Sequence, residues 1–167
     1  MKQLKTLLLA SACILTVSFT QAQSKIAHIN TNELISAMPE TKAAQAELEA
    51  LQKTYTTDLQ NMGTELQNKS KQYTAEAATK TQEENAKREQ ELMTMEQNAR
   101  QFNTKASQDI QEKQEALFKP ITEKARAAIL KVGRAQGFDY VLDSSVGVTI
   151  VADGKDLLND VKKELGI

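Results

Sequence analysis

Cysteine is almost absent from this chain: Cys13 is the only one among 167 residues, and it lies near the N-terminus. The first 22 residues are typical of a secretory signal peptide, because Lys2 and Lys5 precede an apolar run from Leu7 to Phe19, and small and polar residues follow up to Ala22. We therefore expect export, cleavage near Ala22 and a mature chain 23–167 that has no thiol. Disulfides, cysteine-ligated metals and thiol nucleophiles are excluded for such a chain.

Two other interpretations of the leader are weaker. The apolar run is shorter than the roughly 20 residues that span a bilayer, which disfavours an uncleaved membrane anchor. A lipoprotein cleavage site at Cys13 is disfavoured because the hydrophobic run continues beyond the cysteine as far as Phe19.

Aromatic residues, glycine and proline are also scarce. Aromatic residues make up 4% of the chain, there is no Trp, and only six Gly and two Pro occur. This is too little aromatic area for the core of a large compact enzyme. Ala, Glu, Lys, Gln and Thr dominate instead, which is the composition of long helices exposed to water. The sequence thus predicts a rod-like, mostly helical protein.

Long runs of basic residues are absent as well. Without the leader lysines, 19 basic residues stand against 22 acidic ones, which is a net charge of −3 for the mature chain. The longest uninterrupted basic run is Lys162-Lys163, whereas a protein that binds a nucleic-acid duplex needs a basic stripe to displace counterions. Nucleic acid is therefore not expected as a partner.

The sequence contains no recognisable set of catalytic or metal-binding residues, so we predict no catalytic residue, no metal and no cofactor. His28 is the only histidine and has no second ligand or acid near it in sequence, which favours a structural or surface role. Four aspartates occupy strand-edge, turn and cap positions where Asp is ordinary, and their spacing matches no calcium loop. These are Asp139, Asp143, Asp153 and Asp156.

Residues 40–120 are expected to form a long antiparallel helical hairpin, or arm. From Glu40 to Lys119 there is no proline and one glycine. Apolar residues recur every eleven residues in both halves of the stretch, as in Leu51-Met62-Tyr73, which predicts helices that run nearly straight or with slight right-handed coiling. The stretch 78–89 lacks large apolar residues, and facing apolar pairs such as Leu48 with Leu117 are symmetric about the same region. The tip is therefore placed near 82–83, on an arm of roughly 60 Å.

The remaining segments, 23–39 and 121–167, are predicted to form a small body with the arm, in one domain of α+β class that is mostly α. Pro120 is expected to interrupt and kink the returning helix. The expected elements of the body are a strand at 25–30, a helical turn at 33–38, a β-hairpin of 138–143 with 146–152, and an amphipathic helix starting at 153–156. Three short strands with open edges are marginal for a lone body of this size, so we expect self-association.

Over the whole expected mature chain, the sequence resembles the Skp (OmpH) family of periplasmic chaperones. The resemblance rests on the strand at 25–30, the block from Pro120 to Ile129, the strand Gly137-Phe138-Asp139-Tyr140-Val141-Leu142-Asp143, and Ala152-Asp153 before a terminal helix. It implies a periplasmic homotrimer whose three arms enclose unfolded outer-membrane proteins. It implies no use of ATP and no catalysed reaction. The family's better-known members are strongly basic, so the charge of this chain gives no support for a lipopolysaccharide or membrane contact.

Candidate residues can be named for the trimer body and for client binding. The expected trimer body contains Ile26, Ile29, Phe138, Tyr140 and Leu142, with Tyr140 as a buried part of its core. Client contacts are diffuse; the candidates are Met93, Tyr73 and Met62, because Met and aromatic groups repack around varied partners. Met93 lies off the helical seam, whereas Met62 and Tyr73 also serve seam packing. The alternative function is an envelope scaffold that binds one defined partner, which would call for a concentrated apolar patch on the outer face of an arm.

Overall fold

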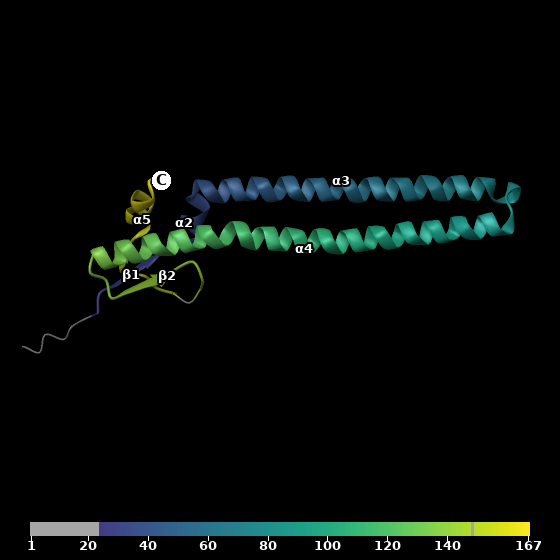
Figure 1. Ribbon diagram of the computed structural model, residues 1–167. Coiled ribbons are helices and arrows are strands. Elements are labelled where there is room, and N and C mark those ends of the chain that lie inside the picture. The colour runs from purple at the N-terminus through teal and green to yellow at the C-terminus, as the bar shows by residue number, and fades with distance from the viewer. Residues whose placement is uncertain (1–23, 148) are drawn as a thin grey trace, which may run out of the picture.

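The computed structural model describes residues 24–147 and 149–167, and it places a long pair of helices beside a small body at one end (Figure 1). The expected signal peptide, residues 1–22, lies outside the described residues. Within the described part, no helix combines the length and apolar character needed to cross a bilayer. The elements in chain order are β1 (Ile26–Ile29), α2 (Thr31–Ala37), α3 (Pro39–Glu76), the 3-10 helix η1 (Ala77–Thr79), α4 (Gln82–Ala135), β2 (Tyr140–Asp143), β3 (Lys155–Asp156) and α5 (Leu158–Leu165). The fold is mostly helical with a small sheet, as the sequence predicts.

The arm is made by α3 and α4, which lie side by side and run in opposite directions (Figure 1). Pro39 begins α3, in a first-turn position where its missing N–H has no intrahelical partner to lose. Thr81 caps α4 in a capping box with Glu84. The turn therefore occupies residues 77–81, and residues 82–83 belong to the first turn of α4. The tip expected near 82–83 is therefore a few residues too late in the sequence. Facing apolar pairs give the offset between the two helices, but they do not locate the residue that caps α4.

Pro120 does not interrupt the returning helix. Helix α4 continues through it from Gln82 to Ala135, so the expected helix boundary at Ile121 is wrong. Proline removes one backbone hydrogen bond from a helix interior. Pro120 is exposed, and water can hydrate the carbonyl that loses this bond.

The sheet has the order β2-β1-β3, with β1 parallel to both neighbours. Ile26 pairs with Tyr140 and Ala27 with Val141, while Ala27 also faces Lys155 on the other side. The expected β-hairpin is therefore wrong: β2 pairs with β1, and none of the described residues between 144 and 152 is in a strand. Alternating polarity identifies a half-buried strand, but it does not say which strand lies beside it.

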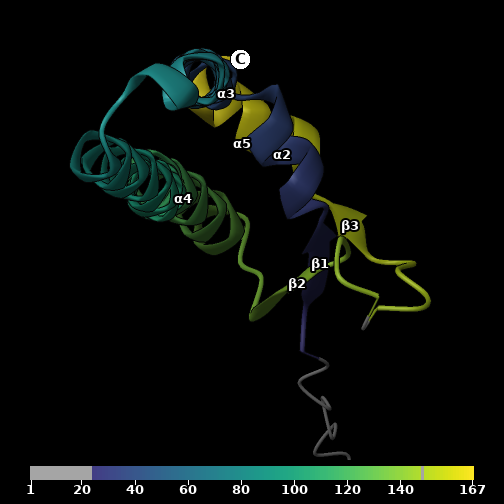
Figure 2. The same cartoon turned by 90° about the vertical axis from the view of Figure 1, so that its right-hand side faces the viewer.

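The core lies between one face of this sheet and the helices α2, α4 and α5 (Figure 2). Its largest fully buried side chains are Ile29, Leu34, Met38, Leu157 and Val161. Tyr140 is 59% exposed, so the expectation that it belongs to the core is wrong. The pairing of Ala27 with Val141 turns those two residues inward, and it leaves Tyr140 on the opposite face of the strand.

Candidate functional site

The seam of the arm is thin. From Leu48 to Ala99 its apolar residues are only half-buried, and Ala106 is the first buried one on the returning helix. Tyr55 and Phe102 pack edge to face with ring centroids 5.7 Å apart, and the Tyr55 hydroxyl donates to Asp109 over 2.8 Å. A seam of this kind holds the helices together but leaves apolar surface partly open to water along its length.

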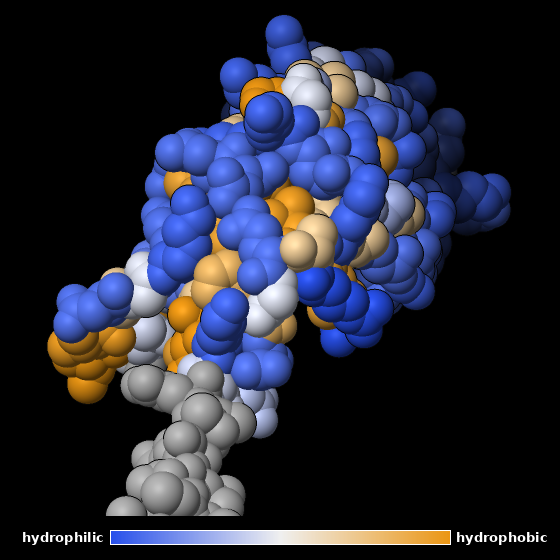
Figure 3. All heavy atoms as spheres, turned by 90° about the vertical axis from the view of Figure 1, so that its left-hand side faces the viewer, coloured by the Kyte–Doolittle hydropathy of each residue, from blue (hydrophilic) through white to orange (hydrophobic). Residues whose placement is uncertain are grey.

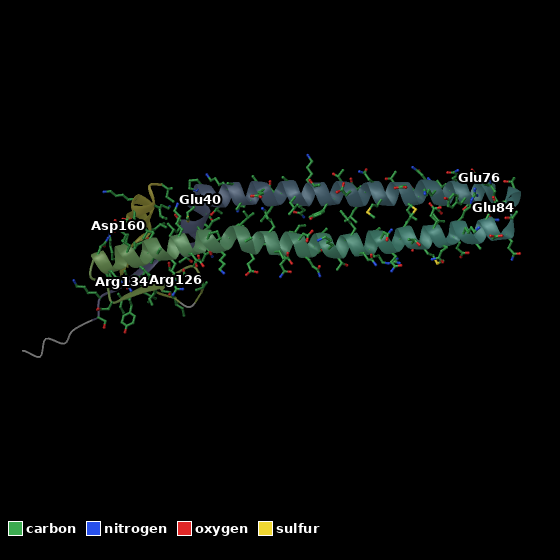
Figure 4. All side chains as sticks on the ribbon, in the orientation of Figure 1. Glu40, Glu76, Glu84, Arg126, Arg134 and Asp160 are labelled. Carbon is green, nitrogen blue, oxygen red and sulfur yellow. The ribbon has the colours of Figure 1, made fainter. Side chains whose placement is uncertain are left out.

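Near the tip, a group of polar and aromatic side chains joins the two helices. We call Lys69, Tyr73, Glu76, Arg88 and Glu91 the distal network. The Tyr73 hydroxyl donates to Glu91 over 2.6 Å, and Lys69 forms an ion pair with the same carboxylate. The Arg88 guanidinium donates to Glu76 over 2.6 Å and lies 4.6 Å from the centre of the Tyr73 ring, a cation–π geometry. Figure 4 shows Glu76 at this end of the arm.

The distal network shifts the titration of its members. Hydrogen bonds from Lys69 and then from Tyr73 hold the pKa of Glu91 below its ordinary value. Bonds from Gln72 and from Arg88 likewise lower the pKa of Glu76. The bond to Glu91 raises the pKa of the Tyr73 hydroxyl, since ionising the phenol would remove the donor. The network is therefore intact when its carboxylates are charged.

Acid is expected to loosen the distal part of the arm. A carboxylate whose pKa is lower in the folded state stabilises that state above its unfolded pKa, and the contribution is lost as the pH falls through the folded value. Amide hydrogen exchange around residues 69–91 should therefore speed up, relative to the rest of the arm, as the pH falls below about 4.

Glu91→Gln should flatten this pH dependence, because the variant has no charge to lose at this position. Glu89→Gln is the matched control, an exposed position two residues away on the same helix. Equal pH dependence in the two variants, or distal amides as protected at low pH as at neutral pH, would contradict the role of the network.

The three candidate client residues have different surroundings. Met93 is 50% exposed. Met62 is half-buried on the seam, and Tyr73 is engaged in the distal network. Only Met93 is available without disturbing the contact between α3 and α4.

The body presents an apolar outer face. On the side of the sheet away from the core, Ile26 is 48%, Tyr140 59% and Leu142 43% exposed. The two other residues expected in the trimer body, Ile29 and Phe138, belong to or pack against the chain's own core and are less accessible. Figure 3 looks onto the body end and shows hydrophobic residues at the surface among hydrophilic ones. Contiguous exposed apolar surface of this kind marks interaction sites.

The loop between β2 and β3 also exposes apolar residues. In this loop Val146 is 53%, Ile150 93% and Val151 72% exposed. The loop projects from the side of the sheet that lies away from α4 (Figure 2). The outer face in this article means Ile26, Tyr140 and Leu142, and the apolar loop means the described residues of 146–151.

A groove of about 630 Å³ lies between α4 and β2. Arg126, Leu130 and Arg134 line it from α4, and the two arginines are labelled in Figure 4. Neither arginine forms an ion pair with any described residue, whereas Lys124 pairs with Glu40 and Lys131 with Glu164. The full lining is Ile29, Thr31, Arg126, Ile129, Leu130, Gly133, Arg134, Phe138, Asp139, Val141 and Asp143.

Three of the four aspartates considered as metal ligands, Asp139, Asp143 and Asp156, have structural partners within the body. Asp143 accepts hydrogen bonds from the Thr31 hydroxyl over 2.6 Å and the Ser145 amide over 2.9 Å. Burial alone would raise the pKa of Asp143, but these bonds together hold it below its ordinary value. Asp139 accepts from the Lys25 amide and Asp156 from the Leu158 amide. Within residues 24–147 and 149–167, no three His, Cys, Asp or Glu side chains are placed to hold a metal ion.

Comparison with known families identifies the chain. A family model described as "Outer membrane protein (OmpH-like)" matches residues 25–165. The chain belongs to the OmpH-like family. Among solved structures, it is similar to a putative outer membrane chaperone (OmpH-like) from Caulobacter crescentus CB15, with a TM-score of 0.76 and 17% identity over 86% of this chain and 85% of that one. At that identity the likeness shows the fold alone, and no curated protein matches the chain.

The family resemblance read from the Gly137–Asp143 strand is thus confirmed, but sequence reasoning missed two features of this OmpH-like chain. One is the distal network, whose partners come from two helices and have no common motif. The other is the pair Arg126 and Arg134, which lie eight residues apart and so share one face of α4 with Leu130 between them. A search for uninterrupted basic runs cannot find such a pair, whereas a search at helical spacing would.

Proposed function

We propose that this protein is an ATP-independent periplasmic chaperone that holds unfolded outer-membrane proteins, and that it works as a homotrimer. The observation that carries the proposal is the half-buried seam of the arm, because apolar side chains spaced along the whole length of α3 and α4 can each make a weak contact. Many weak contacts together give useful affinity without one defined pocket. Membership of the OmpH-like family supports the same conclusion.

The body supports self-association. Strands β2 and β3 are the two edges of the three-stranded sheet, so no strand of the described residues lies beside their outer backbone groups. The outer face adds exposed Tyr140 and Leu142 next to one of these edges. A small sheet with open edges and an apolar face is stabilised when copies of the chain cover both, and a closed ring of three leaves no copy with an uncovered face.

A scaffold that binds one defined partner is the second candidate, and the arm does not favour it. Such a protein would need a concentrated apolar patch on the outer surface of the arm. Among residues 39–119, Met93 is the only large apolar residue that is strongly exposed. A lone residue of this kind suits a diffuse contact better than a specific interface.

The direct test is suppression of aggregation. A β-barrel protein unfolded in urea is diluted into buffer without nucleotide, and light scattering is followed with and without the chaperone. We expect one trimer per client to abolish most of the scattering, because the half-buried seam covers exposed apolar segments of the client. Unchanged scattering, or suppression that needs a nucleotide, would contradict the proposal. The scaffold would then be the remaining candidate function.

Single substitutions on the arm should have small effects on this activity. Met93→Ser removes one exposed contact of many and is expected to weaken client binding by no more than about threefold. Thr94→Ser is a matched control, since Thr94 is also exposed and is the next residue on α4. A loss of a hundredfold or more for Met93→Ser would indicate one concentrated site and contradict the diffuse mode of binding.

A further inference from the structure

The groove between α4 and β2 has the features of a binding site whose occupant comes from outside the chain. Its apolar part includes Ile129, Leu130, Phe138 and Val141, and Leu130 is 45% exposed there. Arg126 and Arg134 flank Leu130 on either side, about 6 Å away along the helix axis in each direction.

The two acids that line the groove do not neutralise these arginines. Asp143 is bound by Thr31 and Ser145, and Asp139 is bound by the Lys25 amide. An occupant should therefore present an apolar group with an acidic group a short distance from it.

The apolar loop of the same sequence matches this description. Ile150 and Val151 are 93% and 72% exposed, so the chain's own fold covers little of either side chain. Asp153 follows two residues later, is exposed, and forms no ion pair with any described residue. In an extended chain Val151 and Asp153 are about 7 Å apart, close to the spacing between Leu130 and either arginine.

The groove and the loop lie on different sides of the same body. Figure 2 shows the loop on the side of the sheet away from α4, whereas α4 and β2 form the groove. Two different patches that fit each other make a head-to-tail contact, which closes into a ring when the rotation between copies allows it.

We propose that the apolar loop of one copy of this chain docks into the groove of the next copy. In this contact Ile150 and Val151 pack against Leu130 and Phe138, and Asp153 forms an ion pair with Arg126 or Arg134. The inference rests on the proposed trimer, and it identifies one of the contacts that join its subunits. It also accounts for the high exposure of Ile150 and Val151 in the single chain.

Disulfide trapping tests the contact directly. In a chain carrying Cys13→Ser, the double substitution Leu130→Cys and Ile150→Cys is oxidised and separated on a non-reducing gel. We expect covalent dimers and closed trimers from the double variant, and no cross-linked species from either single variant. Bonds formed only within a chain, no bond at all, or dimers from Leu130→Cys alone would overturn the proposal, the last because it indicates a symmetric contact.

Charge reversal provides a second test that does not depend on cysteine chemistry. Asp153→Arg should weaken self-association by about tenfold or more, because it brings like charges together in the contact. Combining it with Arg126→Glu or with Arg134→Glu should restore association to within about threefold of the original chain in one of the two pairs. Lys119→Glu, an exposed reversal on the same helix outside the groove, is the matched control and should change little. Failure of both pairs to restore association would overturn the proposal.

The outcomes for this contact and for the trimer itself can be told apart. Sedimentation of the unmodified chain tests for the trimer. A monomer at micromolar concentrations would overturn both the proposed trimer and the proposed contact. If the chain is a trimer but gives no cross-link between positions 130 and 150, only the proposed contact is overturned. The groove would then have another occupant, such as a client segment.

Discussion

Leu34→Ala is expected to lower the free energy of unfolding of the body by about 2–5 kcal/mol, the cost of truncating a fully buried leucine that leaves a cavity. Leu34 has no exposed surface and belongs to the core cluster between α2, α4 and α5. The measurement is urea denaturation, with hydrogen exchange at β1 and α5 to locate the loss. These amides should exchange faster, while those of the arm beyond Leu48 change little, because the seam is separate from this core.

Tyr140→Ala is the informative comparison for Leu34→Ala. Because Tyr140 is 59% exposed, the substitution should cost the isolated body less than about 1 kcal/mol, whereas it removes area from the outer face. We therefore expect Tyr140→Ala to weaken self-association at nearly unchanged stability of the fold. If Tyr140→Ala destabilised the monomeric body as much as Leu34→Ala, the assignment of the two faces of the sheet would be wrong.

Gly154→Ala is expected to detach β3 from β1. A Cβ added at position 154 would lie 2.9 Å from the backbone carbonyl oxygen of Ile26, and a backbone atom in the central strand cannot move aside as a side chain can. The cost should be about 1–3 kcal/mol, as for other cases of overpacking. The amide of Leu157, which donates to the His28 carbonyl over 3.0 Å just beyond β3, should lose its protection from exchange.

Gly63→Ala is the matched control for Gly154→Ala, with an effect of opposite sign. A Cβ at position 63 would have nothing within 4 Å, and the residue lies in the interior of α3. Alanine there should stabilise the helix by about 0.5–1 kcal/mol, because glycine loses more backbone entropy on folding. Thermal unfolding of both variants followed by circular dichroism is the measurement. A Gly154→Ala protein with an unchanged melting curve and intact protection at Leu157 would show that the close approach to Ile26 is not required.

The residues proposed to bind were only partly predictable from the sequence. Met93 could be placed outside the seam from spacing alone, and it is exposed in the structure. Tyr140 could not be placed correctly, since alternation in a strand defines two faces but does not say which one the helices cover. The arginine pair could have been found from its helical spacing, but the groove could not, because α4 and β2 form it together only after both have packed on the core.

The sequence by itself determined the helical arm, the strand at β1, the presence of a terminal helix and the family of the chain. These follow from local properties: helix-forming composition, apolar spacing, caps such as the Pro39 start of α3, and a short strand signature. The expected start of the terminal helix at 153–156 is wrong, because β3 (Lys155–Asp156) comes before α5 (Leu158–Leu165). Tertiary structure decided the partners of each strand, the inward face of the sheet, the contacts of the distal network and the shape of the groove. These depend on residues far apart in the chain, as when Lys25 binds Asp139 across 114 positions, and local periodicity carries no information about which distant surface will be met.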